Sequence, residues 1–99
     1  MKICTVHDVP ADAQLIDVRE PDEFQGGHAK GARNLPMSEF TAHVKDVDTS
    51  RDVYVICHLG GRSAQVAEYL SQVAGDDAAE IYSVDGGTDA WKSAGLPME

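Results

Sequence analysis

Short apolar runs separated by polar segments recur along the chain. The runs are rich in residues that favour strands, and those in the middle of the chain are continuously apolar instead of alternating with polar positions. Continuous apolar runs are typical of parallel strands that are covered on both faces of a sheet. We therefore predict strands at residues 3–6, 15–18, 53–57 and 80–84, with a short extended piece near 33–35.

Helical patterns fill the segments between these runs. Proline and acidic residues mark first turns, apolar residues recur three and four positions apart, and glycines follow as terminators. Strands that alternate with helices predict a parallel α/β sandwich with right-handed crossovers. The predicted helices begin at Pro21, at Ser38, near Arg62 with Gly75 as terminator, and at Thr88 as the cap of a last helix ending near Gly95 and Pro97.

The chain has the size and uniformity of one domain. It has 99 residues, 42% of them hydrophobic, and no internal repeat or linker divides it, so we expect a single domain over 1–99. Two cysteines are too few for a disulfide scaffold, which favours a reducing compartment. No signal-peptide core begins the chain and no apolar run approaches ~18 residues, so we expect a cytoplasmic protein.

Acidic residues dominate the charge of the chain. There are 17 of them against 8 basic residues, which gives a net charge of −9. Nucleic acids and anionic lipids are usually met by clustered Lys and Arg, so we expect neither nucleic acid nor a membrane as a partner. An anionic substrate has to be attracted by a local positive potential.

Cys57 ends a predicted buried strand, and the chain then enters a glycine pair and a helix. Chemistry in parallel sheets gathers beyond the carboxyl ends of strands. Gly60 and Gly61 allow a tight turn in which successive N–H groups point at Cys57, and the following helix adds the positive end of its dipole. Both effects lower a thiol pKa from ~8.5, so we predict a thiolate nucleophile at neutral pH. The alternative is that Cys57 is a small buried residue of the core.

The length of the loop after Cys57 separates two kinds of anion site. Cysteine phosphatases have five residues between their cysteine and arginine, whereas four separate Cys57 from Arg62. The shorter loop fits a single sulfur atom better than a tetrahedral phosphate. A phosphatase or an arsenate reductase is therefore disfavoured.

Three segments of the chain, in order and at suitable separations, match the signatures of one family. They are LIDVREPDEF (15–24) followed by GHAKGARNLP (27–36), the loop CHLGGRS (57–63), and VDGG (84–87) with Trp91, Gly95 and Pro97. On these motifs, which cover nearly the whole chain, the protein resembles the rhodanese family of single-domain sulfurtransferases. The resemblance implies a three-layer α/β/α sandwich with a five-stranded parallel sheet.

The resemblance also implies a ping-pong sulfurtransferase. The Cys57 thiolate takes a sulfane sulfur from thiosulfate or a persulfide, and the resulting persulfide passes it to cyanide, a thiol or a protein. The inferred loop of N–H groups would stabilise the thiolate and the persulfide anion alike. The alternative is a docking or sulfur-carrier module that acts with a partner protein without turnover. We expect no cofactor and no metal, because Cys4 and His7 alone do not make a zinc site.

Several residues extend the candidate site around Cys57. Arg62 is expected to be its fixed cation, which binds the donor anion or steadies the loop, although it could instead be solvated. Because it is one cation in an acidic chain, we expect weak thiosulfate binding that salt weakens further. We interpret Asp17 and Arg19 as a buried salt bridge or loop brace. The candidate set is Cys57 as nucleophile, His58, Leu59, Gly60, Gly61, Arg62 and Ser63 as the loop, and Asp17, Arg19, Gly86 and Gly87 as support.

Overall fold

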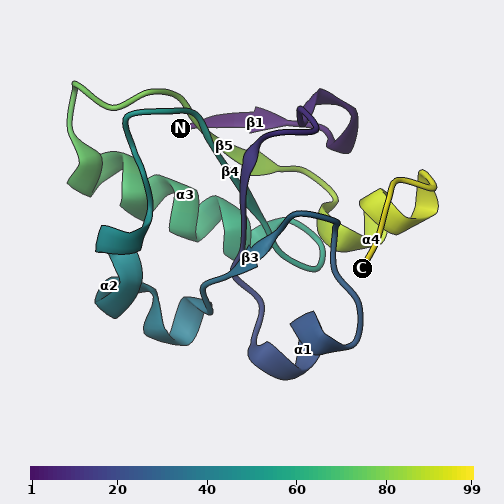
Figure 1. Ribbon diagram of the computed structural model, residues 1–99. Helices are drawn as coiled ribbons and strands as arrows, with labels where there is room; N and C mark the ends of the chain where they lie inside the picture. Colours follow the sequence, from purple (N-terminus) through teal and green to yellow (C-terminus); the bar gives the residue numbers. More distant parts are fainter.

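A five-stranded sheet forms the centre of the protein. The computed structural model describes all 99 residues. The strands lie in the order β1-β5-β4-β2-β3, and every pair of neighbours is parallel (Figure 1). This confirms the expected all-parallel sheet. The strands are β1 (Lys2–Cys4), β2 (Gln14–Asp17), β3 (Arg33–Asn34), β4 (Val53–Ile56) and β5 (Ile81–Val84).

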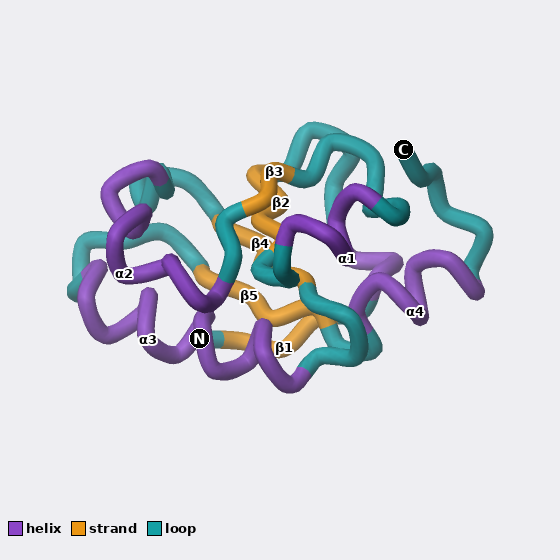
Figure 2. Tube along the Cα trace, turned by 90° about the horizontal axis from the view of Figure 1, so that it is seen from below, coloured by secondary structure: helices purple, strands orange, loops and turns teal.

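Helices cover both faces of this sheet. In Figure 2, α2 and α3 lie on one side of the strands and α4 lies on the other, while α1 lies near the end of the sheet. None of the helices combines the length and apolar character needed to cross a bilayer. The α-helices are α1 (Pro21–Gln25), α2 (Phe40–His43), α3 (Gly61–Ala74) and α4 (Gly87–Ser93), and short 3-10 helices occupy η1 (Val6–Asp8), η2 (Met37–Glu39) and η3 (Val44–Asp46).

The side chains of β4 explain why its sequence is continuously apolar. All four residues are buried, and they alternate between two hydrophobic clusters. Val53 and Val55 pack with α2 and α3 on one face, and Tyr54 and Ile56 pack with Trp91 of α4 on the other. β4 therefore lies at the centre of the sheet, and the residue that follows it emerges at the carboxyl edge.

Two predicted boundaries are wrong. The first strand is shorter than 3–6, because Val6 begins η1, a turn in which the Thr5 hydroxyl accepts from the His7 N–H and the Asp8 carboxylate accepts from the Thr5 N–H. The last helix is not capped by Thr88. Its N-cap is Gly86, and Thr88 lies inside α4. The other strand boundaries and the starts of α1 and α3 agree with the prediction to within one residue. The helix expected from Ser38 is instead divided into η2, α2 and η3.

Candidate active site

Cys57 lies directly after β4, at the carboxyl edge of the sheet. The chain turns at Gly60, which has a φ of 116° in the left-handed region, and α3 begins at Gly61. Glycine is the residue that adopts this φ at little cost, so the pair allows the abrupt change from strand to helix. The Cys57 side chain is buried, with 1% of the residue exposed.

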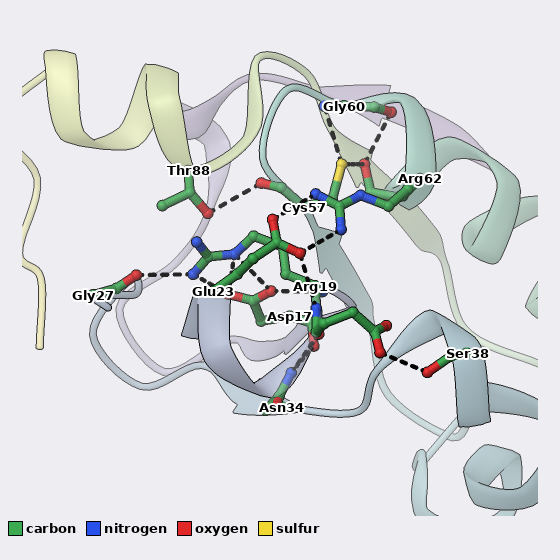
Figure 3. Close-up of polar contacts among 12 residues, drawn as sticks. Asp17, Arg19, Glu23, Gly27, Asn34, Ser38, Cys57, Gly60, Arg62 and Thr88 are labelled. Atoms are coloured by element: carbon green, nitrogen blue, oxygen red, sulfur yellow. Dashed lines mark hydrogen bonds and ion pairs between the residues drawn. The ribbon is translucent and has the colours of Figure 1, made fainter. Parts of the chain in front are cut away.

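Hydrogen-bond donors converge on the Cys57 sulfur. The Gly60 N–H donates to Sγ at 3.1 Å (Figure 3). The Ser63 hydroxyl oxygen lies 3.5 Å from Sγ. Burial raises the pKa of the Cys57 thiol, but hydrogen bonds from the Ser63 hydroxyl and from the N–H groups of Ser63, Gly60 and Leu59 outweigh it. The pKa therefore lies below its ordinary value, which favours the thiolate.

A second buried hydroxyl lies behind Ser63. The Ser83 Oγ is 2.8 Å from the Ser63 Oγ, and both residues are almost fully buried. Ser63 also reaches the Gly60 carbonyl at 3.1 Å, so its hydroxyl can donate to that oxygen or to the sulfur. Sequence reasoning missed Ser83. The signal was a serine in β5, a strand whose other residues are apolar or aromatic.

The start of α4 holds the backbone of the Cys57 loop. The Thr88 N–H and hydroxyl donate to the Cys57 carbonyl at 2.7 and 3.0 Å, and the Asp89 N–H donates to the His58 carbonyl at 3.1 Å. Gly87, with a φ of 57°, lies so close that a Cβ built there would be 2.5 Å from the His58 carbonyl oxygen. The turn at Gly86 and Gly87 thus flanks the loop and leaves no room for a side chain at position 87.

Asp17 and Arg19 form the buried brace expected from the sequence. The Arg19 guanidinium contacts the Asp17 carboxylate at 2.9 Å, and the Asp17 side chain is fully buried. Arg19 also donates to the Gly27 carbonyl at 2.9 Å. The pair therefore connects the end of β2 to the segment after α1, and its two charges offset one another.

Arg62 is paired with a carboxylate that the sequence reasoning did not single out. Its two terminal nitrogens contact the two oxygens of Glu23 at 2.7 and 2.9 Å (Figure 3). The hydrogen bond from Arg62 is the main reason why the pKa of Glu23 falls to about 2. Arg62 thus connects the Cys57 loop to α1, and the charge of Glu23 offsets its positive charge. Of the two expected roles, steadying the loop is the one that this contact provides.

The outer part of the loop borders a shallow cleft. Leu59 is 62% exposed, so it lies on the surface beside Cys57 and does not close a pocket. His58 is also exposed. A larger cavity of about 520 Å³ is lined in part by Val6, Leu15 and Trp91, and none of the candidate residues lines it. The cleft beside the loop measures about 200 Å³ and is lined by Arg19, Glu23, Gly26, Gly27, His58, Thr88, Asp89, Lys92 and Met98.

The second cysteine lies away from the site. Cys4 is buried in the cluster on the α4 face, as expected for a core residue. Burial, with a smaller contribution from Asp8, raises the pKa of the Cys4 thiol to about 11. No group of three or more potential ligands joins Cys4 and His7. The two thiols therefore differ sharply in their readiness to ionise.

Comparison with known proteins assigns the chain to a family. The family described as "Rhodanese-like domain" matches residues 6–94. The chain is 43% identical over 79 residues to "Uncharacterized protein YqhL" of Bacillus subtilis, which covers 80% of this chain and 60% of that protein. It is 38% identical over 87 residues to "Thiosulfate sulfurtransferase GlpE" of Vibrio cholerae, which covers 88% of this chain and 79% of that protein. The chain thus spans less than two thirds of the Bacillus relative.

Solved structures show the same fold. A rhodanese-related protein from Thermoplasma volcanium has a TM-score of 0.86 and 28% identity, over 100% of this chain and 98% of that one. The protein SSP1007 from Staphylococcus saprophyticus has a TM-score of 0.82 and 30% identity, over 98% of this chain and 99% of that one. These similarities cover nearly the whole chain.

Proposed function

Because the chain belongs to the rhodanese-like domain family, we propose that it is a sulfurtransferase that carries a sulfane sulfur on Cys57. One observation carries the proposal: at the carboxyl edge of the sheet, hydrogen-bond donors that point at the Cys57 sulfur lower the pKa of its thiol. The similarity to a thiosulfate sulfurtransferase supports the same reaction class.

The first half-reaction transfers sulfur to the protein. The Cys57 thiolate attacks the outer sulfur of the donor, and a bond forms between Sγ and that sulfur. The sulfur–sulfur bond of the donor breaks, and its electron pair leaves with the remainder, which is sulfite when the donor is thiosulfate. A persulfide anion is left on Cys57, so the total charge is conserved and no external oxidant is needed.

The second half-reaction returns the free thiolate. An acceptor such as cyanide or a thiolate attacks the outer sulfur of the persulfide, and Cys57 leaves with the electron pair. The Gly60 N–H and the Ser63 hydroxyl are placed to stabilise a negative charge at this position. They therefore stabilise the thiolate that this half-reaction releases.

A carrier that acts only with a partner protein is the second candidate. The exposure of Leu59 beside the nucleophile favours it, because an apolar side chain at the mouth of a site is suited to protein contact. Turnover with small donors and acceptors distinguishes the enzyme from such a carrier.

Intact mass spectrometry tests the proposal. The wild-type protein is exposed briefly to thiosulfate or glutathione persulfide, and then to cyanide. We expect a gain of one sulfur atom that cyanide removes with release of thiocyanate. The C57S variant should gain none, whereas C4A, which lacks only the core thiol, should behave as wild type.

Two results would contradict this role of Cys57. One is a sulfur adduct that persists in C57S, and the other is a wild-type protein that accepts sulfur from neither donor while Cys57 remains reduced. Circular dichroism of C57S checks that the variant is folded. Loss of the fold would indicate that Cys57 is a structural residue of the core.

A further inference from the structure

Arg62 is the only arginine or lysine within the loop 57–63. Its guanidinium group is already hydrogen-bonded to the Glu23 carboxylate. The two planar groups meet through two parallel hydrogen bonds at 2.7 and 2.9 Å, the bidentate arrangement that an oxyanion would otherwise adopt. Each of the two side chains is 34% exposed. An anionic donor can therefore reach this guanidinium only by sharing it with Glu23 or displacing Glu23.

Glu23 is also held in place by a hydrogen bond from the residue that precedes α1. Its Oε1 accepts from the Glu20 N–H at 3.1 Å, at the start of α1, and the Glu20 carboxylate accepts from the Ser38 hydroxyl at 2.7 Å. Its pKa of about 2, which is due first to the Arg62 hydrogen bond, keeps it ionised at neutral pH. The carboxylate is thus a fixed negative charge beside the Cys57 loop.

The charged residues that line the cleft beside the loop do not replace Arg62. Arg19 is neutralised by Asp17. Lys92 and Asp89 of α4 line the same cleft with opposite charges. The site therefore offers no excess positive charge to a donor.

We propose that Glu23 is a specificity-determining residue, which by occupying Arg62 disfavours doubly charged donors such as thiosulfate. The favoured donors carry at most one negative charge at the reacting group, as organic persulfides and thiosulfonates do. This inference rests on the proposed sulfurtransferase function.

Methanethiosulfonate and thiosulfate form a matched pair of donors. They differ by a methyl group in place of one charged oxygen, so the same attack applies to both. The Cys57 thiolate binds the outer sulfur, the sulfur–sulfur bond breaks, and methanesulfinate leaves with its electron pair in place of sulfite. The ratio of the two kcat/KM values measures the charge preference and cancels changes in the reactivity of Cys57.

The variant E23Q tests the role of Glu23, with D22N as its matched control. Gln keeps the shape and the oxygen that accepts from the Glu20 N–H. Asp22 lies in the same turn of α1, but its exposed carboxylate contacts no cation. Each unit of donor charge at a separation of several ångströms in water contributes about threefold. We therefore expect E23Q to raise kcat/KM about tenfold for thiosulfate and about threefold for methanethiosulfonate, which shifts their ratio about threefold.

The outcomes separate this inference from simpler explanations. We expect D22N to change the ratio by less than about twofold. We expect the E23Q gain to be smaller in an R62Q background, where no guanidinium is released to bind the donor. An unchanged or lower ratio in E23Q, an equal shift in D22N, or an equal gain with and without Arg62 would overturn the role of Glu23.

The same experiment distinguishes failure of the inference from failure of the proposed function. If wild type transfers sulfur from methanethiosulfonate but E23Q leaves the ratio unchanged, only the specificity role is wrong. If neither wild type nor E23Q takes sulfur from any of the donors, the sulfurtransferase function is wrong and the inference with it.

Discussion

Beside the Cys57 thiol, Ser63 and Ser83 form a short chain of buried hydroxyl groups. The oxygens lie 2.8 Å apart, and Ser63 is the member that reaches Cys57. When Ser83 donates to Ser63, the Ser63 hydroxyl becomes a better donor to a thiolate, because hydrogen bonds in a chain polarise one another. We therefore expect Ser83 to act on Cys57 through Ser63, as a positioning residue.

The variant S83A is expected to make the Cys57 thiolate harder to form. Loss of the donor to Ser63 raises the pKa of Cys57 towards its ordinary value, so the midpoint of the pH profile for alkylation moves to higher pH. The lost hydrogen bond costs about 1 kcal/mol of stability. The rate of iodoacetamide labelling between pH 5 and 10 measures the shift.

A matched control shows whether the effect is specific. The Ser71 hydroxyl donates within α3 to the Ala67 carbonyl at 2.8 Å and does not contact the thiol. S71A should leave the alkylation profile unchanged. A profile for S83A that superimposes on that of wild type would show that Ser83 only fills space in the core.

At the level of elements, the contact between α4 and the Cys57 loop leaves room only for glycine at position 87. The backbone there has a φ of 57°, and an added Cβ would overlap the carbonyl oxygens of Cys57 and His58. These atoms are backbone, so they cannot move without displacing the loop that Thr88 holds in place.

The variant G87A is therefore expected to destabilise the protein, by about 2–4 kcal/mol in denaturant unfolding. The cost combines the left-handed backbone with the overlap. G61A is the comparison, because a Cβ at this first position of α3 meets nothing within 4 Å. Alanine there should be neutral or stabilising by up to about 1 kcal/mol. Equal stability of the two variants would contradict the close packing of α4 on the loop.

For the whole molecule, the pairing of Arg19 and Arg62 with carboxylates changes the expected effect of salt on thiosulfate binding. An unpaired Arg62 would attract thiosulfate, and salt would weaken that attraction. Because Glu23 offsets Arg62 and Asp17 offsets Arg19, the net charge of −9 instead repels the dianion over long range. Salt screens this repulsion. From these ion pairs we expect a salt dependence opposite in sign to the one expected from the sequence.

We expect the KM for thiosulfate to fall about two- to threefold as ionic strength rises from ~0.01 to ~0.15 M, where the Debye length shortens from ~30 to ~8 Å. Methanethiosulfonate, with one charge, should show a weaker dependence. Steady-state kinetics in two different salts measures the effect and controls for binding of a particular anion. A KM that rises with salt in both would indicate that Arg62 is available to the donor.

The sequence alone predicts the features that depend on neighbouring residues. Continuous apolar runs indicated a buried parallel sheet, and the glycine pair after Cys57 indicated the turn into α3. These patterns can be recognised in the sequence because burial, helical periodicity and backbone freedom depend on a few neighbouring residues. Thr88 shows the limit. Its local pattern resembles a cap, but its hydroxyl is engaged by the Cys57 carbonyl, 31 positions away.

Only the tertiary structure decided the pairing of side chains around the thiol. Arg62 and Glu23 are 39 positions apart, and Ser63 and Ser83 are 20 apart. No local pattern joins them, because their proximity depends on the strand order and on crossovers that bring loops from separate strands to one edge of the sheet. The sequence therefore determined that Cys57 lies at that edge, between a buried strand and a helix start. The fold decided which charges and hydroxyl groups surround it.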